Sequence, residues 1–142
     1  MAAPTKLRIL FADDELWEMR PTIDALKARG DEVTVVTDGT EVIEYLRDNR
    51  ERLPDLLVLD IMMPEGAAIK TSDDGRTTGV EVYRQIRDAM KIEIPIVIST
   101  VVTDNELLMQ LKRDRKVLIV QKPYRFEELA YAIRQVMSGA AR

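Results

Sequence analysis

The feature that most constrains the fold of this chain is a regular alternation between two apolar patterns. Five short apolar runs, rich in leucine and β-branched residues, are typical of buried strands and cover residues 7–12, 33–37, 56–59, 94–99 and 117–120. After each run, apolar residues recur every three or four positions, which predicts a helix. Strands that are apolar on both faces and alternate with helices predict a parallel sheet covered on both sides.

The five expected helices differ in how clearly their ends can be read. Gly30 should close the first helix, and Pro21 inside it marks a kink or a late start. Thr40 is the expected N-cap of the second helix, which should run to about Asn49. The third helix follows a stripe from Val80 to Met90, the fourth covers about residues 104–115, and the fifth carries a stripe from Leu129 to Val136.

The order of these elements favours one architecture. The right-handed crossover rule predicts a doubly wound α/β sandwich, and a common strand order for five strands is 2-1-3-4-5, as in flavodoxin-like folds. A chain of 142 residues fits a single domain, so we expect one domain over residues 1–142 with a short tail at 138–142. In this topology, ligands bind at the carboxyl ends of the strands, beside the switch between strands 1 and 3.

Composition narrows the chemistry that such a site can perform. The chain has no cysteine and no histidine, which excludes thiol catalysis, imidazole bases and the metal sites that need either residue. Its net charge of −4 and its single short basic run at 112–116 predict no direct binding of nucleic acid. No run of 18 apolar residues and no signal pattern is present, so we expect a soluble cytoplasmic protein that does not enter a membrane.

Polar residues follow four of the predicted strands. Asp13 and Asp14 end strand 1, Asp60 ends strand 3, Thr100 ends strand 4 and Lys122 follows strand 5. In the order 2-1-3-4-5 these strands are neighbours, so their carboxyl ends should meet in one cleft. Three carboxylates at such close range repel one another unless a cation lies among them, and Mg²⁺ prefers oxygen ligands. The cleft is therefore suited to a metal and a phosphoryl group, with one aspartate as nucleophile.

Four stretches in this order resemble one known family. They read ILFADDE at 9–15, LLVLDIMMP at 56–64, IPIVIST at 94–100 and QKPY at 121–124. With them the chain resembles the receiver domain of the response regulators of two-component phosphorelay systems. The resemblance implies a phosphoprotein of signal transduction, with Asp60 as the residue that accepts the phosphoryl group.

The resemblance also implies roles for five further residues. Asp14 is expected to bind Mg²⁺ directly, and Asp13 directly or through water, together with Asp60 and the backbone carbonyl of Met62. Lys122 is expected to pair with the phosphoryl oxygens, and Lys122–Pro123 corresponds to a cis peptide in the family. Thr100 is expected to donate its hydroxyl to the phosphoryl group, although Ser99 is an adjacent rival.

Partners follow from the same resemblance. The phosphodonor is expected to be a sensor histidine kinase or a histidine phosphotransfer protein, because the chain has no histidine of its own. The chain is expected to be a phosphoacceptor and not a classical enzyme, and to signal as a monomer or weak dimer through an unknown downstream protein. Since five βα units use all 142 residues, we expect a stand-alone receiver without an output domain.

Two other interpretations remain open. The family usually has a small residue where Val101 stands and an aromatic residue where Ile119 stands. These departures suit a pseudo-receiver, an interaction scaffold whose site does not switch. The chain could also be a receiver fragment of a longer regulator. Taken alone, Asp13 and Asp14 are also typical of a helix N-terminus.

A long polar loop interrupts the rhythm of the elements. The segment from residue 66 to 78, between the third strand and its helix, is an insertion relative to the usual loop of two to six residues. Because it follows strand 3 directly, it must begin near Asp60. Its charged residues would suit a polar interface with a partner: Lys70, Asp73, Asp74 and Arg76. The alternative is a mobile surface loop without a role.

Overall fold

The structure, a computed structural model, describes residues 6–73 and 75–139. Five parallel strands form one sheet in the order β2-β1-β3-β4-β5, as the sequence predicts. The strands are β1 (Arg8–Ala12), β2 (Glu32–Val36), β3 (Leu56–Leu59), β4 (Ile96–Thr100) and β5 (Val117–Gln121). This order places the buried strand β3 at the centre, between β1 and β4.

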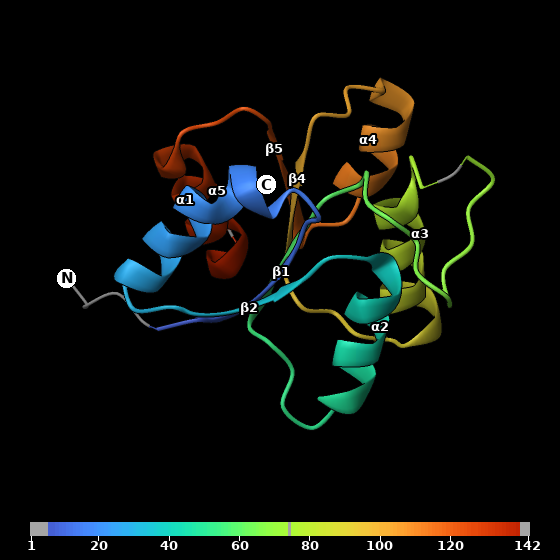
Figure 1. The fold of residues 1–142 in the computed structure, drawn as a ribbon, viewed down its shortest axis with the longest axis horizontal. Coiled ribbons are helices and arrows are strands. Elements are labelled where there is room, and N and C mark those ends of the chain that lie inside the picture. Colours follow the sequence, from blue (N-terminus) through green and yellow to red (C-terminus); the bar gives the residue numbers. More distant parts are fainter. Residues whose placement is uncertain (1–5, 74, 140–142) are drawn as a thin grey trace.

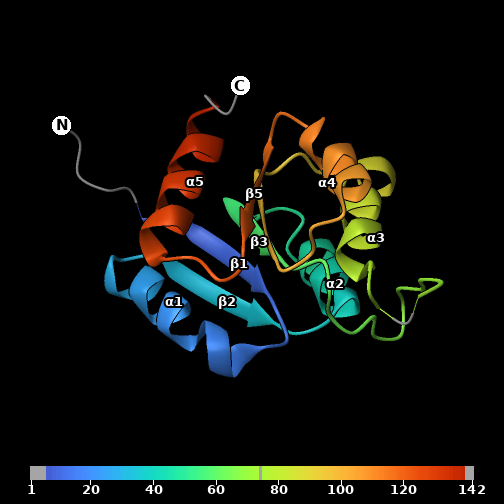
Figure 2. The same ribbon diagram turned by 90° about the horizontal axis from the view of Figure 1, so that it is seen from above.

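Helices cover both faces of the sheet (Figures 1 and 2). They are α1 (Leu16–Ala28), α2 (Gly39–Asp48), α3 (Thr78–Arg84) with the π-helical turn η1 (Gln85–Ala89), α4 (Asn105–Lys112) and α5 (Phe126–Ser138). Helices α1 and α5 lie on one face, and α2, α3 and α4 lie on the other (Figure 2). The doubly wound α/β sandwich is thus confirmed.

The strands divide their side chains between two cores. Side chains alternate along a strand, so Leu56 and Val58 pack with α1 and α5, whereas Leu57 and Leu59 pack with α2, α3 and α4. All four side chains are fully buried. Burial on both faces explains why this strand reads as an unbroken apolar run, and it fixes the end of β3 where Asp60 follows.

Three expectations about element ends need correction. The N-cap of α2 is Asp38, whose carboxylate accepts from the Glu41 N–H at 2.7 Å, and not Thr40. Strand β4 begins at Ile96 and not at residue 94, since Pro95 has no N–H to give to a sheet. The third helix keeps its apolar stripe but changes to a π-helical turn at Gln85.

The expected tail and the inserted loop lie only in part within the described residues. Helix α5 ends at Ser138, and Gly139 takes the left-handed conformation that commonly closes a helix. The rest of the expected tail, residues 140–142, lies outside the described residues, as does Asp74 of the inserted loop. Among the described residues, no helix is long and apolar enough to cross a membrane.

Candidate functional site

Lys122 joins the acidic residues at the carboxyl end of the sheet. Its Nζ lies 2.7 Å from Asp13 Oδ2 and 2.9 Å from Asp60 Oδ2. Glu15 Oε1 is 3.6 Å from the same nitrogen. The peptide bond between Lys122 and Pro123 is cis, as the resemblance implies. Asp13, Asp60 and Lys122 thus meet as predicted, from the ends of β1, β3 and β5.

The site keeps charged groups away from water. Asp13 is 1% exposed and Asp60 is 3% exposed. Burial raises the pKa of Asp60 above its usual value, although the hydrogen bond and the charge of Lys122 oppose this. Burial acts to lower the pKa of the Lys122 ammonium, but its bonds to Asp13 and Asp60 outweigh burial and raise that pKa. The cluster therefore holds a charged lysine against the Asp60 carboxylate, which is costly to ionise.

Glu15 is a site residue that the sequence analysis did not single out. Oxygen atoms of Asp13, Glu15 and Asp60 all lie within 4.8 Å of one another. The Glu15 backbone N–H donates to Asp13 Oδ1 at 2.9 Å, which holds the turn between β1 and α1. The run Asp13-Asp14-Glu15 was a signal for it, but parallel-strand topology alone does not say which of three successive carboxylates face the cleft. Carboxylate oxygens are the ligands that a hard cation such as Mg²⁺ prefers, so this set fits such an ion.

Asp14 lies at the edge of the same cluster. It lines the pocket above Asp60 and is exposed, in contrast to Asp13. Partial burial raises the pKa of its carboxyl group, and the nearby negative charges of Asp13 and Glu15 add to this effect. The cluster of three close carboxylate oxygens does not include Asp14, which remains a predicted metal ligand.

The segment after β3 is held close to the acceptor aspartate. The Met62 backbone N–H donates to Asp60 Oδ1 at 3.1 Å, and the Met62 side chain is 42% exposed. A Cβ added at Gly79, the second residue of α3, would lie 2.4 Å from the Asp60 carbonyl oxygen. The start of α3 therefore packs directly against Asp60, and only glycine fits there.

Thr100 and Ser99 end β4 in different environments. Both are fully buried. The Thr100 hydroxyl accepts from the Val102 N–H at 3.2 Å, whereas the Ser99 hydroxyl lies 2.7 Å from the Tyr124 hydroxyl. Ser99 already has a partner in Tyr124, which weakens it as a rival to Thr100. In the described part of the chain, no hydrogen bond links Thr100 to Asp60, and the role of Thr100 stays a prediction.

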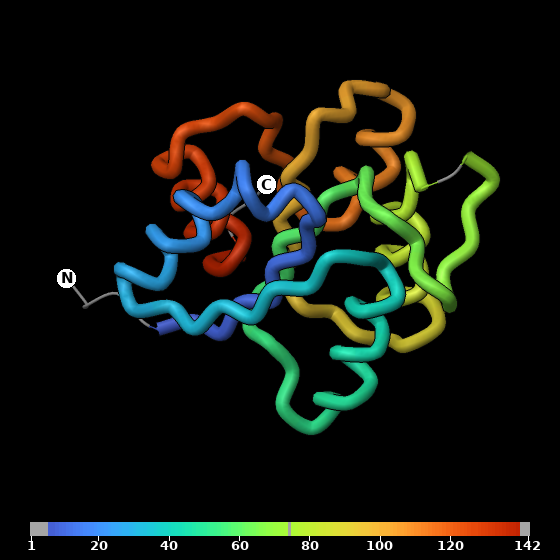
Figure 3. Tube along the Cα trace, in the orientation of Figure 1, coloured from blue at the N-terminus to red at the C-terminus, as the bar shows by residue number. Residues whose placement is uncertain are grey.

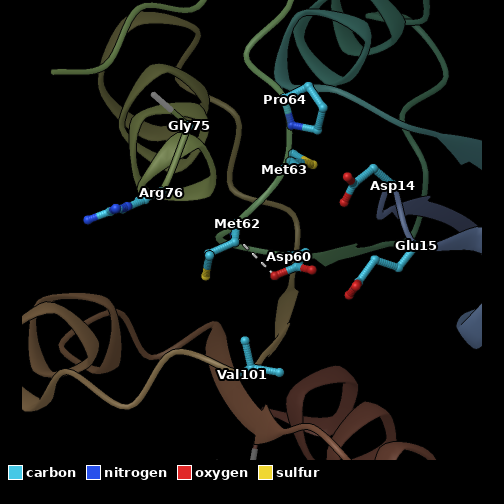
Figure 4. A pocket seen from close by; sticks show the side chains of 9 residues that line it. All are labelled: Asp14, Glu15, Asp60, Met62, Met63, Pro64, Gly75, Arg76 and Val101. Carbon is cyan, nitrogen blue, oxygen red and sulfur yellow. Dashed lines mark hydrogen bonds between the residues drawn. The ribbon is translucent and has the colours of Figure 1, made fainter. Parts of the chain in front are cut away.

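An open pocket leads from solvent to Asp60 (Figure 4). It is lined by residues of the turn after β1, the segment after β3, the inserted loop and the turn after β4. These residues are Asp14, Glu15, Asp60, Met62, Met63, Pro64, Gly75, Arg76 and Val101. Val101 is 54% exposed, and its branched side chain lines this pocket beside Asp60.

The fold and the site together define a class of protein: a doubly wound α/β domain with a buried aspartate, a lysine and an acidic cluster at the carboxyl edge of its sheet. Residues 9–134 match the family model described as "Response regulator receiver domain". The chain belongs to this family. The resemblance seen in the four sequence motifs is thereby confirmed.

Similar proteins agree with this assignment. The chain is 31% identical over 134 residues to "Response regulator MprA" of Mycobacterium leprae and 30% identical to that of Mycobacterium ulcerans. Each match covers 92% of this chain, but only 51% and 50% of those relatives. The chain thus spans about half the length of these curated relatives.

Solved structures of low sequence identity share the fold. A signal receiver domain of a putative Luxo repressor protein from Vibrio parahaemolyticus aligns with TM-score 0.76 and 18% identity, over 96% of this chain and 93% of that one. A CheY-like receiver domain protein from Methanospirillum hungatei aligns with TM-score 0.73 and 18% identity, over 96% and 97%. These likenesses support the receiver fold.

Proposed function

We propose that this chain is a phosphoacceptor: Asp60 receives a phosphoryl group, in a Mg²⁺-dependent reaction, from a histidine kinase or a histidine phosphotransfer protein. One observation carries the proposal. The buried Asp60 carboxylate lies 2.9 Å from the Lys122 ammonium and close to two further carboxylates, Asp13 and Glu15. An acidic nucleophile beside a fixed cation, at the end of an open pocket, suits phosphoryl transfer.

The transfer step moves one phosphoryl group between two nucleophiles. An oxygen of the Asp60 carboxylate attacks phosphorus, and the P–N bond of the phosphohistidine donor breaks. The bonding electron pair leaves with the imidazole nitrogen, and the new P–O bond makes Asp60 an acyl phosphate. When bound, Mg²⁺ supplies positive charge that offsets the charge on the phosphoryl oxygens.

The residues around Asp60 have separate tasks in this proposal. Lys122 holds the carboxylate in place before transfer and pairs with a phosphoryl oxygen afterwards. Asp13, Asp14, Glu15 and the Met62 carbonyl are the groups that would hold the metal. The Thr100 hydroxyl would turn from the Val102 N–H to the phosphoryl group.

The remaining expectations belong to the same proposal. The chain acts as a recipient and not as a classical enzyme, since its own aspartate is consumed in each transfer. Its signal passes to an unknown downstream protein, and the chain is a monomer or weak dimer without direct contact to nucleic acid. A cytoplasmic location stays a prediction.

The competing candidate is a scaffold that does not switch, and the exposed Val101 at the pocket favours it. Incubation with acetyl phosphate and Mg²⁺, followed by intact-protein mass spectrometry, separates the two. The phosphoacceptor gains the mass of one phosphoryl group, and Asp60→Asn abolishes the gain. The exposed Asp48 is a matched control, because Asp48→Asn lies far from the site and should leave the gain unchanged. An unmodified native protein would establish the scaffold instead.

A further inference from the structure

The inserted segment after β3, whose path Figure 3 shows, makes contacts with the rest of the domain through its described residues. Ile69 is fully buried in the core beneath α2 and α3. The Thr40 hydroxyl donates to the Glu65 carbonyl at 2.9 Å and accepts from the Ala68 N–H at 2.7 Å. Burial of Ile69 and the two hydrogen bonds of Thr40 both favour one path of the loop. These contacts hold the first half of the segment against α2.

The second half of the segment is fixed against the acceptor region. Gly75 has φ +90°, a conformation that favours glycine, and an added Cβ there would lie 3.0 Å from the Met63 carbonyl oxygen. The Gly75 N–H donates to the Thr71 hydroxyl at 3.0 Å, and the Thr78 hydroxyl donates to the Gly75 carbonyl at 3.2 Å. The backbone of the next residue, Arg76, is thereby placed at the wall of the pocket.

Arg76 gives this wall its charge. Of the described residues that line the pocket, Arg76 alone is cationic, and it shares the pocket with the carboxylates of Asp14, Glu15 and Asp60. Figure 4 shows Arg76 on the other side of Asp60 from Asp14 and Glu15, with its guanidinium directed outward. Among residues 6–73 and 75–139, no side chain or backbone group forms an ion pair or hydrogen bond with this guanidinium, and Arg76 is exposed.

The inner cation of the site is less accessible. The Lys122 side chain is 8% exposed, and its ammonium contacts Asp13, Asp60 and Glu15. A phosphodonor approaches with negative charge and meets an acidic entrance. The electrostatic potential at a pocket mouth affects the rate at which charged ligands enter. A cation at the rim that pairs with none of the described residues should therefore raise the entry rate of an anionic phosphodonor. Guanidinium groups also bind two phosphoryl oxygens at once.

We propose that Arg76 positions the incoming phosphodonor: its guanidinium binds the phosphoryl oxygens at the pocket mouth, opposite Asp14 and Glu15, before they reach Asp60 and Lys122. Rotation about the side-chain bonds of Arg76 carries the bound group inward. The inference rests on the proposed phosphoacceptor function. It gives the inserted segment a task, that of holding one arginine at the acceptor pocket.

The test compares second-order rate constants of phosphorylation by intact-protein mass spectrometry. The donors are acetyl phosphate and monophosphoimidazole, a small analogue of phosphohistidine. With Mg²⁺ at low ionic strength, Arg76→Ala should slow both donors by about tenfold, and added salt should narrow the difference. Arg76→Lys should recover only part of the rate, since it retains the charge but does not bind two phosphoryl oxygens at once.

The matched control is Arg84→Ala in the following helix α3, where the exposed arginine pairs with Glu81 at 3.7 Å and donates to the Gln110 side chain at 3.4 Å. This variant should react at the native rate. Arg76→Ala should also keep the native melting temperature and should not weaken Mg²⁺ binding, which a misfolded pocket would do.

Three outcomes have distinct meanings. Equal rates for the native protein and Arg76→Ala with both donors overturn the inference and leave the phosphoacceptor function standing. A loss with acetyl phosphate alone also overturns it, because the shared phosphoryl group would then not be what Arg76 binds. A native protein that neither donor modifies overturns the phosphoacceptor function itself.

Discussion

At the scale of residues, the site depends on one lysine that contacts three carboxylates. Asp13 and Asp60 are nearly inaccessible to water, and Lys122 supplies the closest positive charge to both. Removing one partner of a buried ion pair leaves an uncompensated charge in a region of low polarity. Substitutions in this cluster should therefore change the stability of the domain as well as its phosphorylation.

Lys122→Met should lower the free energy of unfolding at pH 7 by about 3–5 kcal/mol, because it leaves Asp13 and Asp60 buried without a cation. Urea denaturation in the absence of divalent cations measures this. Added Mg²⁺ should restore part of the loss. Lys116→Met is the control: Lys116 is half exposed and lies 3.7 Å from Glu93, so its loss should matter little. A variant at position 122 as stable as the native protein would contradict the prediction.

Asp60→Asn should keep or increase the stability of the domain at pH 7. Because burial raises the pKa of Asp60, the folded state holds this proton more tightly than the unfolded state. The native protein therefore loses stability as pH rises from the usual aspartate pKa through the raised value, and the asparagine variant lacks this loss. Urea denaturation at pH 4 and pH 7 measures the free energy of unfolding of both proteins. The stability of the variant relative to the native protein should be greater at pH 7 than at pH 4. The opposite trend would mean that ionised Asp60 stabilises the fold.

Single residues also show where sequence reasoning stops. Asp60 and Lys122 could be placed together because each follows a strand whose neighbours are fixed by topology. The site role of Glu15 and the loop contact of Thr40 could not be predicted in this way. Glu15 enters the site through the local turn after β1, and Thr40 contacts a loop 25 residues away, so Asp38 is left to cap α2.

At the scale of elements, the inserted segment is anchored by the fully buried side chain of Ile69. Ile69→Ala should lower the free energy of unfolding by about 2–4 kcal/mol, since a cavity remains in the core beneath α2 and α3. It should also speed tryptic cleavage within the segment, at Lys70 and Arg76. Urea denaturation and a timed digest measure the two effects. Native stability and a native digest would mean that the segment is not held by this contact.

A polar contact joins α3 and the π-helical turn η1 to the turn before β5. The Tyr83 hydroxyl donates to Asp114 Oδ2 at 2.8 Å, and Arg87 Nε donates to the same oxygen at 2.7 Å. Burial and the charge of Asp114 raise the pKa of Tyr83 to about 12. The contact spans the π-helical turn, whose extra residue per turn could not be read from the apolar stripe.

This contact gives a pH-dependent prediction. The unfolded chain loses the tyrosine proton near pH 10, whereas folded Tyr83 keeps it to about 12, so Tyr83 contributes stability that falls as pH rises across this range. Tyr83→Phe should remove that part of the decline. Thermal melts of both proteins from pH 9 to pH 12 measure it. Parallel curves would show that the hydroxyl is not held by Asp114.

At the scale of the whole molecule, the fold could be predicted well because its pattern is repeated. Five strands that are apolar on both faces, joined by right-handed crossovers, are compatible with few sheet topologies. The observed strand order is among the commonest of these. The path of the inserted segment could not be predicted, because its polar sequence has no periodicity. Its course depends on contacts of Ile69 and Gly75 with distant parts of the chain.

The whole domain should respond to a phosphoryl analogue. Beryllofluoride with Mg²⁺ binds the folded state only, so it should raise the free energy of unfolding by about 2.7 kcal/mol at a hundredfold excess over its dissociation constant. Thermal melts measure the shift, and Asp60→Asn should show none. A native protein with no shift would favour the scaffold that does not switch.

The most direct test of the central claim is to locate the modified residue. Acetyl phosphate and Mg²⁺ should convert Asp60 to an acyl phosphate, and borohydride reduces an acyl phosphate to an alcohol, so aspartate becomes homoserine. Peptide mass spectrometry after this treatment should find homoserine at position 60. Reduction at Asp13 or Asp14, or no reduced residue at all, would contradict the account.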